Sequence, residues 1–132
     1  MPTMTTKIVH VSIQKGWQAV YDFASKPENM PLWASGRASG LIADGPDWVA
    51  TGMLGTVRVS FAPRNNFGVI DHTVTIDSGL RVFNALRVVP NDDGCEVMFT
   101  LLHLPGMSEA QFAADAAHVA KDLATLKTML ER

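Results

Sequence analysis

The sequence predicts an α+β fold, in which a seven-stranded antiparallel sheet has an apolar face covered by a long C-terminal helix. Three observations predict this fold. Residues 108–131 contain no glycine or proline and carry apolar side chains at helical spacing. Residues 40–104 consist instead of short β-type runs separated by turn clusters rich in glycine, asparagine and aspartate. Residues 7–14 alternate apolar and polar side chains, which adds a strand at the beginning of the chain.

The composition limits both the architecture and the class of partner. A chain of 132 residues can bury one ordinary core and is too short for two, which predicts a single domain over residues 1–132. Hydrophobic residues make up 47% and charged residues 18%, a surplus of interior-type side chains that indicates a lined cavity. The net charge of −2 gives no electrostatic reason to expect nucleic acid as a partner.

Several kinds of site and location are not indicated by the sequence. Apolar runs are shorter than the ~20 residues of a membrane span, so no stable membrane insertion is expected. The N-terminus lacks the features of a signal peptide, which favours a cytoplasmic protein. Cys95 is the only cysteine, which excludes an internal disulfide and a cysteine-based zinc site. Neither a phosphate-binding glycine loop nor a zinc-protease motif is present, so no cofactor and no metal are expected.

The elements between the first strand and residue 40 are two short helices. Apolar side chains at helical spacing predict the first helix over residues 17–24. Ser25 and Glu28 then form a capping-box pattern, with a proline that the first turn of a helix tolerates. This pattern predicts a second short helix, which meets the first at an angle.

Turn clusters divide the middle of the chain into six strands. Short connections make consecutive strands antiparallel, so the six form a meander. Counting from the turn centres places His72 opposite Asn84 and Val59 opposite Ile70, with all four side chains on one face. The predicted strands span about residues 39–43, 47–51, 56–62, 67–76, 80–89 and 95–104.

The C-terminal helix has a clear start and one apolar stripe. Ser108 can cap its first turn while Gln111 reaches back, which is the capping-box arrangement. The apolar stripe must be buried, and the apolar face of the sheet is the surface that can cover it. The stripe consists of Phe112, Ala116, Val119, Leu123, Leu126 and Leu130.

Several stretches resemble a known family. Residues 20–34, 66–72 and 87–91, together with the tail over 103–108 and 122–127, resemble the polyketide cyclase/dehydrase-like bacterial branch of the START-like, birch-pollen-allergen-like helix-grip superfamily. The resemblance covers nearly the whole chain. It implies a curved sheet wrapped around the C-terminal helix, with an apolar cavity between them. The superfamily includes ligand carriers, hormone receptors and cyclases, so the resemblance is specific for the fold and weak for chemistry.

The sequence therefore predicts a cavity protein that binds a small, mostly apolar molecule. Such pockets are largely apolar with a few convergent polar groups. Trp33 lies in the helix-to-strand connection, where it either plugs the core or forms a wall of the cavity mouth. The predicted lining is Trp33, Val57, Val59, Phe61, Ile70, His72, Val74, Asn84, Phe99, Leu101, His103, Phe112, Ala116 and Val119.

His72 and His103 are the candidate catalytic residues of an alternative function, a cyclase or dehydratase using acid–base chemistry. The expected register separates the two imidazoles by ~12 Å, so only a shared ligand could join them. A structural role is the favoured interpretation of both residues: Asn84 can satisfy His72 across the strands, and His103 can be partly solvated at a strand end. A third alternative is that the protein is a structural or interaction module whose cavity is vestigial. The sequence also leaves open whether the protein forms a homodimer.

Three polar residues on the C-terminal helix have two interpretations. Asp115, His118 and Asp122 lie on one side at spacings of three and four. They form either a solvated polar flank or part of a metal site, and the flank is favoured because the sequence suggests no further ligand. Asp71 precedes His72 but points to the opposite face of its strand, so the two do not form an acid–base pair.

Overall fold

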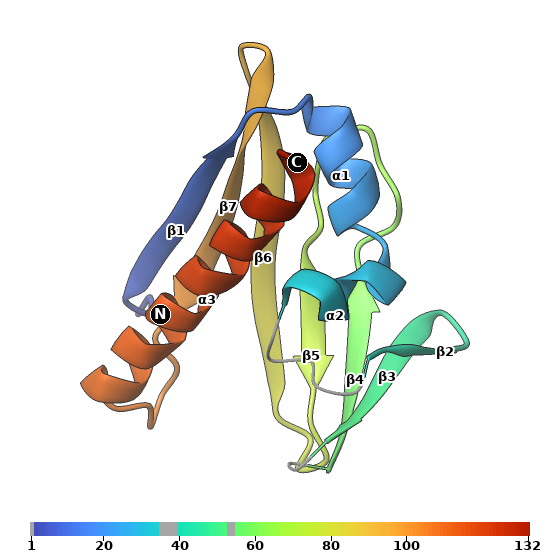
Figure 1. The fold of residues 1–132 in the computed structure, drawn as a ribbon. Coiled ribbons are helices and arrows are strands. Elements are labelled where there is room, and N and C mark those ends of the chain that lie inside the picture. Colours follow the sequence, from blue (N-terminus) through green and yellow to red (C-terminus); the bar gives the residue numbers. More distant parts are fainter. Residues whose placement is uncertain (1, 35–39, 53–54) are drawn as a thin grey trace.

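The computed structural model describes residues 2–34, 40–52 and 55–132 (Figure 1). A first strand leads into helices, then six strands and a long helix, which confirms the predicted element order. The elements are β1 (Thr6–Ile13), α1 (Trp17–Ala24), the 3-10 helix η1 (Pro27–Asn29), α2 (Met30–Trp33), β2 (Ile42–Asp44), β3 (Asp47–Gly52), β4 (Gly55–Phe61), β5 (His72–Thr75), β6 (Arg81–Asn91), β7 (Gly94–Leu102) and α3 (Glu109–Leu130). The predicted strand over 39–43 falls partly on residue 39, outside the described residues.

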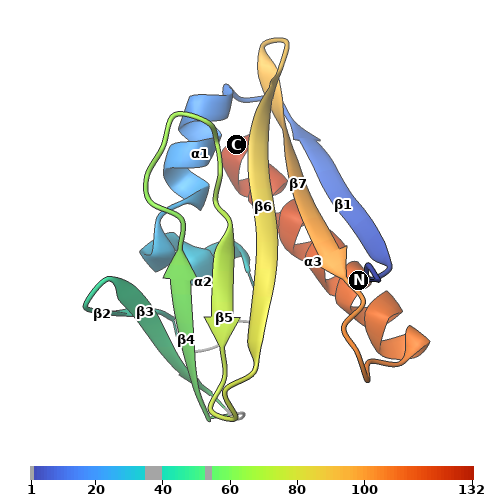
Figure 2. The ribbon, with the colours of Figure 1, turned by 180° about the vertical axis from the view of Figure 1, so that it is seen from behind.

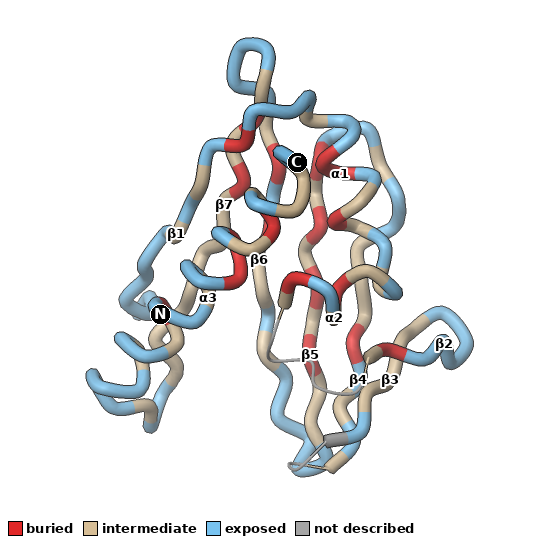
Figure 3. Tube along the Cα trace, in the orientation of Figure 1, coloured by how far each residue is buried: buried red, intermediate tan, exposed pale blue. Residues whose placement is uncertain are grey.

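One antiparallel sheet of seven strands carries the fold, in the order β1-β7-β6-β5-β4-β3-β2. Six strands follow one another in sequence order, and β1 is the exception. It pairs with β7, the last strand, and forms one edge of the sheet. Figures 1 and 2 show α1, α2 and α3 on the same face, while the opposite face carries no helix. Buried residues follow the middle of the sheet and the inward sides of the helices (Figure 3).

Helix α3 begins and docks as the sequence predicts. The Ser108 hydroxyl accepts from Gln111 N at 3.1 Å, and Gln111 Oε1 accepts from Ser108 N at 2.9 Å, so the capping box is present. At the other end, Lys127 Nζ donates to the Ser12 carbonyl at 2.7 Å. Glu131 also accepts from Gln14 N at 2.8 Å, which ties the end of α3 to the end of β1.

The predicted register is right at one strand pair and wrong at another. His72 lies opposite Asn84, as predicted. Val59, however, lies opposite Val74 and not Ile70, because β4 and β5 are joined by a longer connection than a tight turn. The shift is by an even number of residues, so Val59 keeps the face that the sequence predicts.

Asn65 explains the longer connection. Its side-chain oxygen accepts from the backbone N–H groups of Phe67 and Val69 at 2.9 and 3.1 Å, and its amide donates to the carbonyls of Pro63 and Val69. A single side chain thus satisfies backbone groups that a β-ladder would otherwise pair. The predicted strand over 67–76 is accordingly reduced to the shorter β5.

The prediction of a second capping box, formed by Ser25 and Glu28, is wrong. Ser25 ends α1, with its N–H donating to the Tyr21 carbonyl at 2.8 Å, and η1 begins after Lys26 without a side-chain cap. The short helices are held by packing instead: Met30 and Trp33 of α2 are both buried. α2 lies in front of the sheet beside α3 (Figure 1), and this position creates the site described next. Among the described helices none is long and apolar enough to cross a bilayer.

Candidate functional site

A cavity of about 190 Å³ lies between α2, α3 and the middle of the sheet. Its walls come from five elements far apart in the chain. α2 and the residue after it form one side, β5, β6 and β7 form the floor, and the middle of α3 forms the other side. The lining residues are Met30, Trp33, Ala34, His72, Asn84, Leu86, Phe99, His118, Val119, Asp122 and Leu123.

His72 is the polar centre of the cavity floor. It is only 6% exposed, and its Nδ1 lies 3.0 Å from the Ile70 carbonyl, which can only accept. Nδ1 is therefore assigned as the protonated nitrogen, and Nε2 as the acceptor. Asn84 Nδ2 lies 3.4 Å from Nε2, so the cross-strand pair expected from the register is present. The Phe61 ring packs beside the imidazole at 5.3 Å between centroids.

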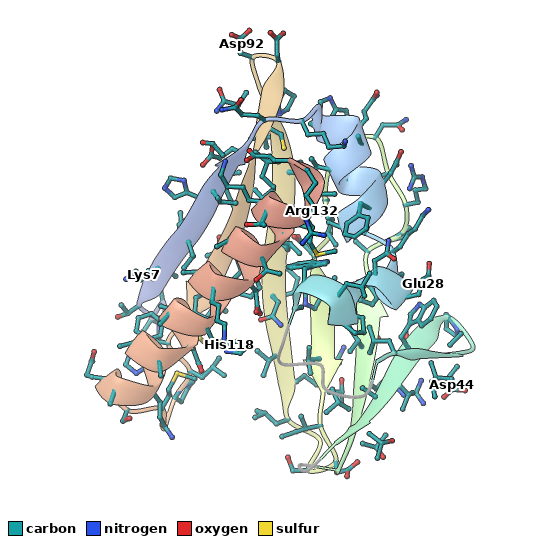
Figure 4. The ribbon with its side chains drawn as sticks, viewed as in Figure 1. Lys7, Glu28, Asp44, Asp92, His118 and Arg132 are labelled. Carbon is teal, nitrogen blue, oxygen red and sulfur yellow. The ribbon has the colours of Figure 1, made fainter. Side chains whose placement is uncertain are left out.

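The opposite wall carries a second polar pair. His118 and Asp122 are one helical turn apart on α3, with 3.5 Å between His118 Nε2 and Asp122 Oδ2. Asp122 is 9% exposed, an unusual burial for a carboxylate, whereas His118 is exposed. Figure 4 places His118 on the side of α3 that faces the middle of the sheet. The sheet and the helix thus each present an imidazole and a second polar side chain to one space.

Trp33 forms an apolar wall with one polar atom. The residue is 5% exposed, and its indole Nε1 has no hydrogen-bond acceptor within the part of the chain that the structure describes. The sequence left open whether Trp33 plugs the core or lines the cavity. It does both, because it belongs to the core cluster and also forms part of the cavity wall.

The structure brings together some of the predicted lining residues and separates others. Five line the cavity: Trp33, His72, Asn84, Phe99 and Val119. Four pack in or against the core cluster on β4 and around β5 without lining this cavity: Val57, Val59, Phe61 and Val74. Ile70 is buried in the same cluster just before β5. The remaining four, Leu101, His103, Phe112 and Ala116, lie toward the N-terminal end of α3.

His103 lies outside the cavity lining and contacts residues near the start of α3. Its Nε2 lies 2.6 Å from the Met107 carbonyl, and its ring stacks on Phe112 at 4.6 Å between centroids, 10° from parallel. The residue follows β7 and its backbone N–H donates to the Thr5 carbonyl at 2.8 Å. His72 and His103 therefore do not line the same cavity, and their joint catalytic role stays a prediction.

Six lining residues were missed by sequence reasoning: Met30, Ala34, Leu86, His118, Asp122 and Leu123. The signal for two of them was present, since His118 and Asp122 share one side of α3 with Asp115. The sequence favours a solvated flank there because it suggests no further ligand, and periodicity does not show that α2 lies across the cavity from this side of α3. Among the described residues no group of three potential ligands could hold a metal ion.

Two other potentially reactive side chains, Cys95 and Asp71, lie outside the cavity lining. Burial raises the pKa of the Cys95 thiol, and the nearby Glu96 carboxylate adds to the effect, so the nucleophilic thiolate is disfavoured. Asp71 forms an ion pair with Arg87, with 2.8 Å between Oδ2 and Nη2, and the hydrogen bond from this pair raises the pKa of Arg87. Asp71 is thus engaged away from His72, as its strand position predicts.

Comparison with known proteins identifies the fold. The sequence matches no family model and no curated protein. Among solved structures, the Aha1 dimer from Colwellia psychrerythraea has a TM-score of 0.76 at 13% identity, over 97% of both chains. Ara h 8.0201 has a TM-score of 0.68 at 10% identity, over 96% of this chain and 97% of the other. The chain has the helix-grip fold.

A third structure differs in length. A protein of the dynemicin biosynthetic locus has a TM-score of 0.73 at 13% identity, over 96% of this chain and 47% of that protein. The chain thus spans about half the length of that relative. At such low identities these likenesses establish the helix-grip fold alone and do not identify the chemistry of the cavity.

Proposed function

We propose that this protein binds a small, mostly apolar molecule in the cavity between α2, α3 and the sheet. The observation that carries the proposal is the cavity itself, at about 190 Å³. An apolar protein cavity of ~150 Å³ is large enough to take up benzene. Here the apolar part of the wall comes from Met30, Leu86, Phe99, Val119 and Leu123. A ligand of about one substituted aromatic ring matches this volume and lining.

The polar groups of the walls support selective binding. Ligand pockets are mainly apolar, and a few placed polar groups orient the ligand within them. Asn84 and His72 present such groups from the sheet, while His118 and Asp122 present theirs from α3. A ligand with polar substituents on a ring can be held in one orientation between these two pairs.

Binding can be tested with single-ring aromatic probes. Titration of the labelled protein with acetophenone, ethylbenzene and phenol, followed by NMR, should shift resonances of the cavity residues. A probe at 100 times its Kd should also stabilise the fold by ~2.7 kcal/mol, which a thermal melt detects.

A matched pair of variants locates the binding. Val119→Phe adds a ring to the cavity wall, whereas Ala124→Phe adds the same ring at an exposed position of the same helix. We expect Val119→Phe to abolish probe binding and Ala124→Phe to retain it. If no probe binds, or if Val119→Phe binds as well as the natural sequence, the proposal is wrong.

An acid–base enzyme is the second candidate, and the tautomer of His72 favours it. Because Nδ1 donates to Ile70, Nε2 is the basic nitrogen, on a residue that lines the cavity. Exchange of the acidic methyl protons of acetophenone in D₂O would reveal such a base. His72→Gln should abolish the exchange while retaining binding. His103→Gln tests the predicted partner: unchanged exchange would remove His103 from the mechanism.

Oligomeric state is a separate question. The Aha1 structure is that of a dimer, and a homodimer remains a prediction for this chain. Analytical ultracentrifugation of the purified protein would show a single species of 14.3 kDa if the prediction is wrong.

A further inference from the structure

The indole N–H of Trp33 is the one polar side-chain atom in the described residues that is buried and has no hydrogen-bond partner. Buried donors in folded proteins nearly always have an acceptor, and an exception calls for a physical explanation. Trp33 is 5% exposed, so bulk solvent does not satisfy its N–H. The residue also lines the cavity, which makes a cavity-bound molecule an available source of the missing acceptor.

Among the residues that the structure describes, the backbone near Trp33 does not supply that acceptor. α2 is a single turn, and its Met30 carbonyl already accepts from Ala34 N at 2.7 Å. Across the cavity, the Ile70 carbonyl accepts from His72 Nδ1 at 3.0 Å. The imidazole, amide and carboxylate acceptors of the walls belong to His72, His118, Asn84 and Asp122, and the Trp33 indole bonds to none of them.

We propose that the ligand of this cavity carries an oxygen acceptor, such as a carbonyl, and that Trp33 Nε1–H donates to it. This inference rests on the proposed ligand-binding function and narrows the ligand class to small aromatic compounds that carry an oxygen acceptor. Trp33 then acts as a specificity-determining residue. Its ring supplies apolar contact, and its N–H discriminates between ligands that do and do not present an acceptor, because a buried donor left unpaired opposes binding of the latter.

Two probes of nearly the same shape isolate the hydrogen bond. Acetophenone has a carbonyl oxygen where α-methylstyrene has a methylene group, so the two differ chiefly in the acceptor. In the ¹H–¹⁵N spectrum, the indole resonances belong to Trp17, Trp33 and Trp48. The Trp33 resonance is assigned by its loss in Trp33→Phe. We expect acetophenone to move the Trp33 indole proton downfield and α-methylstyrene to leave it without a hydrogen-bond shift.

The affinity ratio of the two probes provides a second measurement. Loss of one neutral hydrogen bond corresponds to a change in affinity by a factor of about 3 to 10. Trp33→Phe should therefore lower the affinity for acetophenone by that factor relative to the affinity for α-methylstyrene. Trp48→Phe, on β3 and outside the cavity lining, should leave the ratio unchanged. Retained binding of α-methylstyrene shows that the Trp33→Phe cavity is still folded.

The outcomes separate this inference from the function on which it rests. If both probes bind but the indole proton does not move with acetophenone, and Trp33→Phe leaves the ratio unchanged, the inference is wrong and the ligand-binding function stands. If neither probe binds, the inference is overturned, and if ethylbenzene and phenol also fail to bind, the ligand-binding function is overturned with it. A downfield shift confined to Trp33, with a changed ratio in Trp33→Phe only, supports the inference.

Discussion

The two halves of α3 carry the same apolar stripe but have different surroundings. The first half, residues 109–117, runs beside edge strand β1, and Ala116 is its only buried residue. The second half, residues 118–130, faces α2 and the middle of the sheet, and Asp122, Leu123 and Leu126 are buried there. Figure 3 shows the contrast, with exposed positions prevailing at the N-terminal end of the helix.

The difference shows what an amphipathic pattern can and cannot predict. Periodicity identifies the side of a helix that is buried, but it does not identify which element covers each turn. The sequence suggested a ligand beside Phe112, Ala116 and Val119, with plain core beyond them. α2 covers the helix farther along, so the cavity lies against residues 118–123, and Val119 alone of the three lines it.

The largest expected difference between the halves is in core packing. Leu126 is fully buried, so Leu126→Ala should lower the free energy of unfolding by about 2–5 kcal/mol. Phe112 is half-buried against His103, so Phe112→Ala should cost only about 1–2 kcal/mol despite the larger side chain. Urea denaturation measures both. An equal or larger loss for Phe112→Ala would contradict the comparison.

An intermediate effect is expected at the helix start. Ser108→Ala removes the hydroxyl that accepts from Gln111 N and should cost about 1 kcal/mol. Hydrogen exchange should rise for the amides of the first turns, while the amides around Leu123 and Leu126 keep their protection. Thr128→Ala, which removes an exposed hydroxyl bonded to the Ala124 carbonyl, is the control and should change stability little. Uniformly faster exchange along α3 would show that the halves unfold together.

The smallest effect concerns β1, the edge strand that runs beside α3. Hydrogen bonds from Ser12 and then His10 lower the pKa of Glu96, which joins β7 to β1. The folded-state pKa lies below the unfolded value, so this stabilisation is present above about pH 4.5 and is lost as the pH falls through the folded-state pKa. Glu96→Gln should therefore cost about 0.5–1 kcal/mol at pH 7 and less in acid.

Denaturation at a series of pH values checks this expectation. Removal of the His10 hydrogen bond by His10→Ala should reduce the pH dependence without abolishing it, because Ser12 and Asn91 still donate to Glu96. A difference between the natural sequence and Glu96→Gln that stays constant from pH 7 to pH 3 would exclude Glu96 as the group responsible.

Most of the fold could be predicted because local patterns determine it. Turn clusters and alternation located the strands, and the capping box at Ser108 located α3 within a residue. The register between β4 and β5 could not be predicted, since the side chain of Asn65 stabilises a long connection where a tight turn was expected. The predicted capping box at Ser25 is wrong although its sequence pattern is present. The short helices are held by the packing of buried residues such as Met30, and the 3-10 helix begins without a side-chain cap.

The candidate site was less predictable because it is assembled from elements that only the tertiary structure brings together. Strand register was sufficient to pair His72 with Asn84. The polar pair on α3 required knowledge of α2, whose four residues give almost no periodic signal. No sequence pattern could predict the unpartnered indole N–H of Trp33. Whether a buried donor finds an acceptor depends on the positions of all the groups around it in the folded protein.

The hydrogen bond between His72 and the Ile70 carbonyl has one more consequence. With Nδ1 already donating, an additional proton can be accepted only at Nε2, which lies beside the Asn84 side chain. An asparagine amide presents a donor at one end and an acceptor at the other. Rotation of the Asn84 amide by half a turn would therefore present its oxygen, in place of its N–H, to Nε2 of His72. The one side chain of Asn84 can thus complement Nε2 either as an acceptor or as a donor.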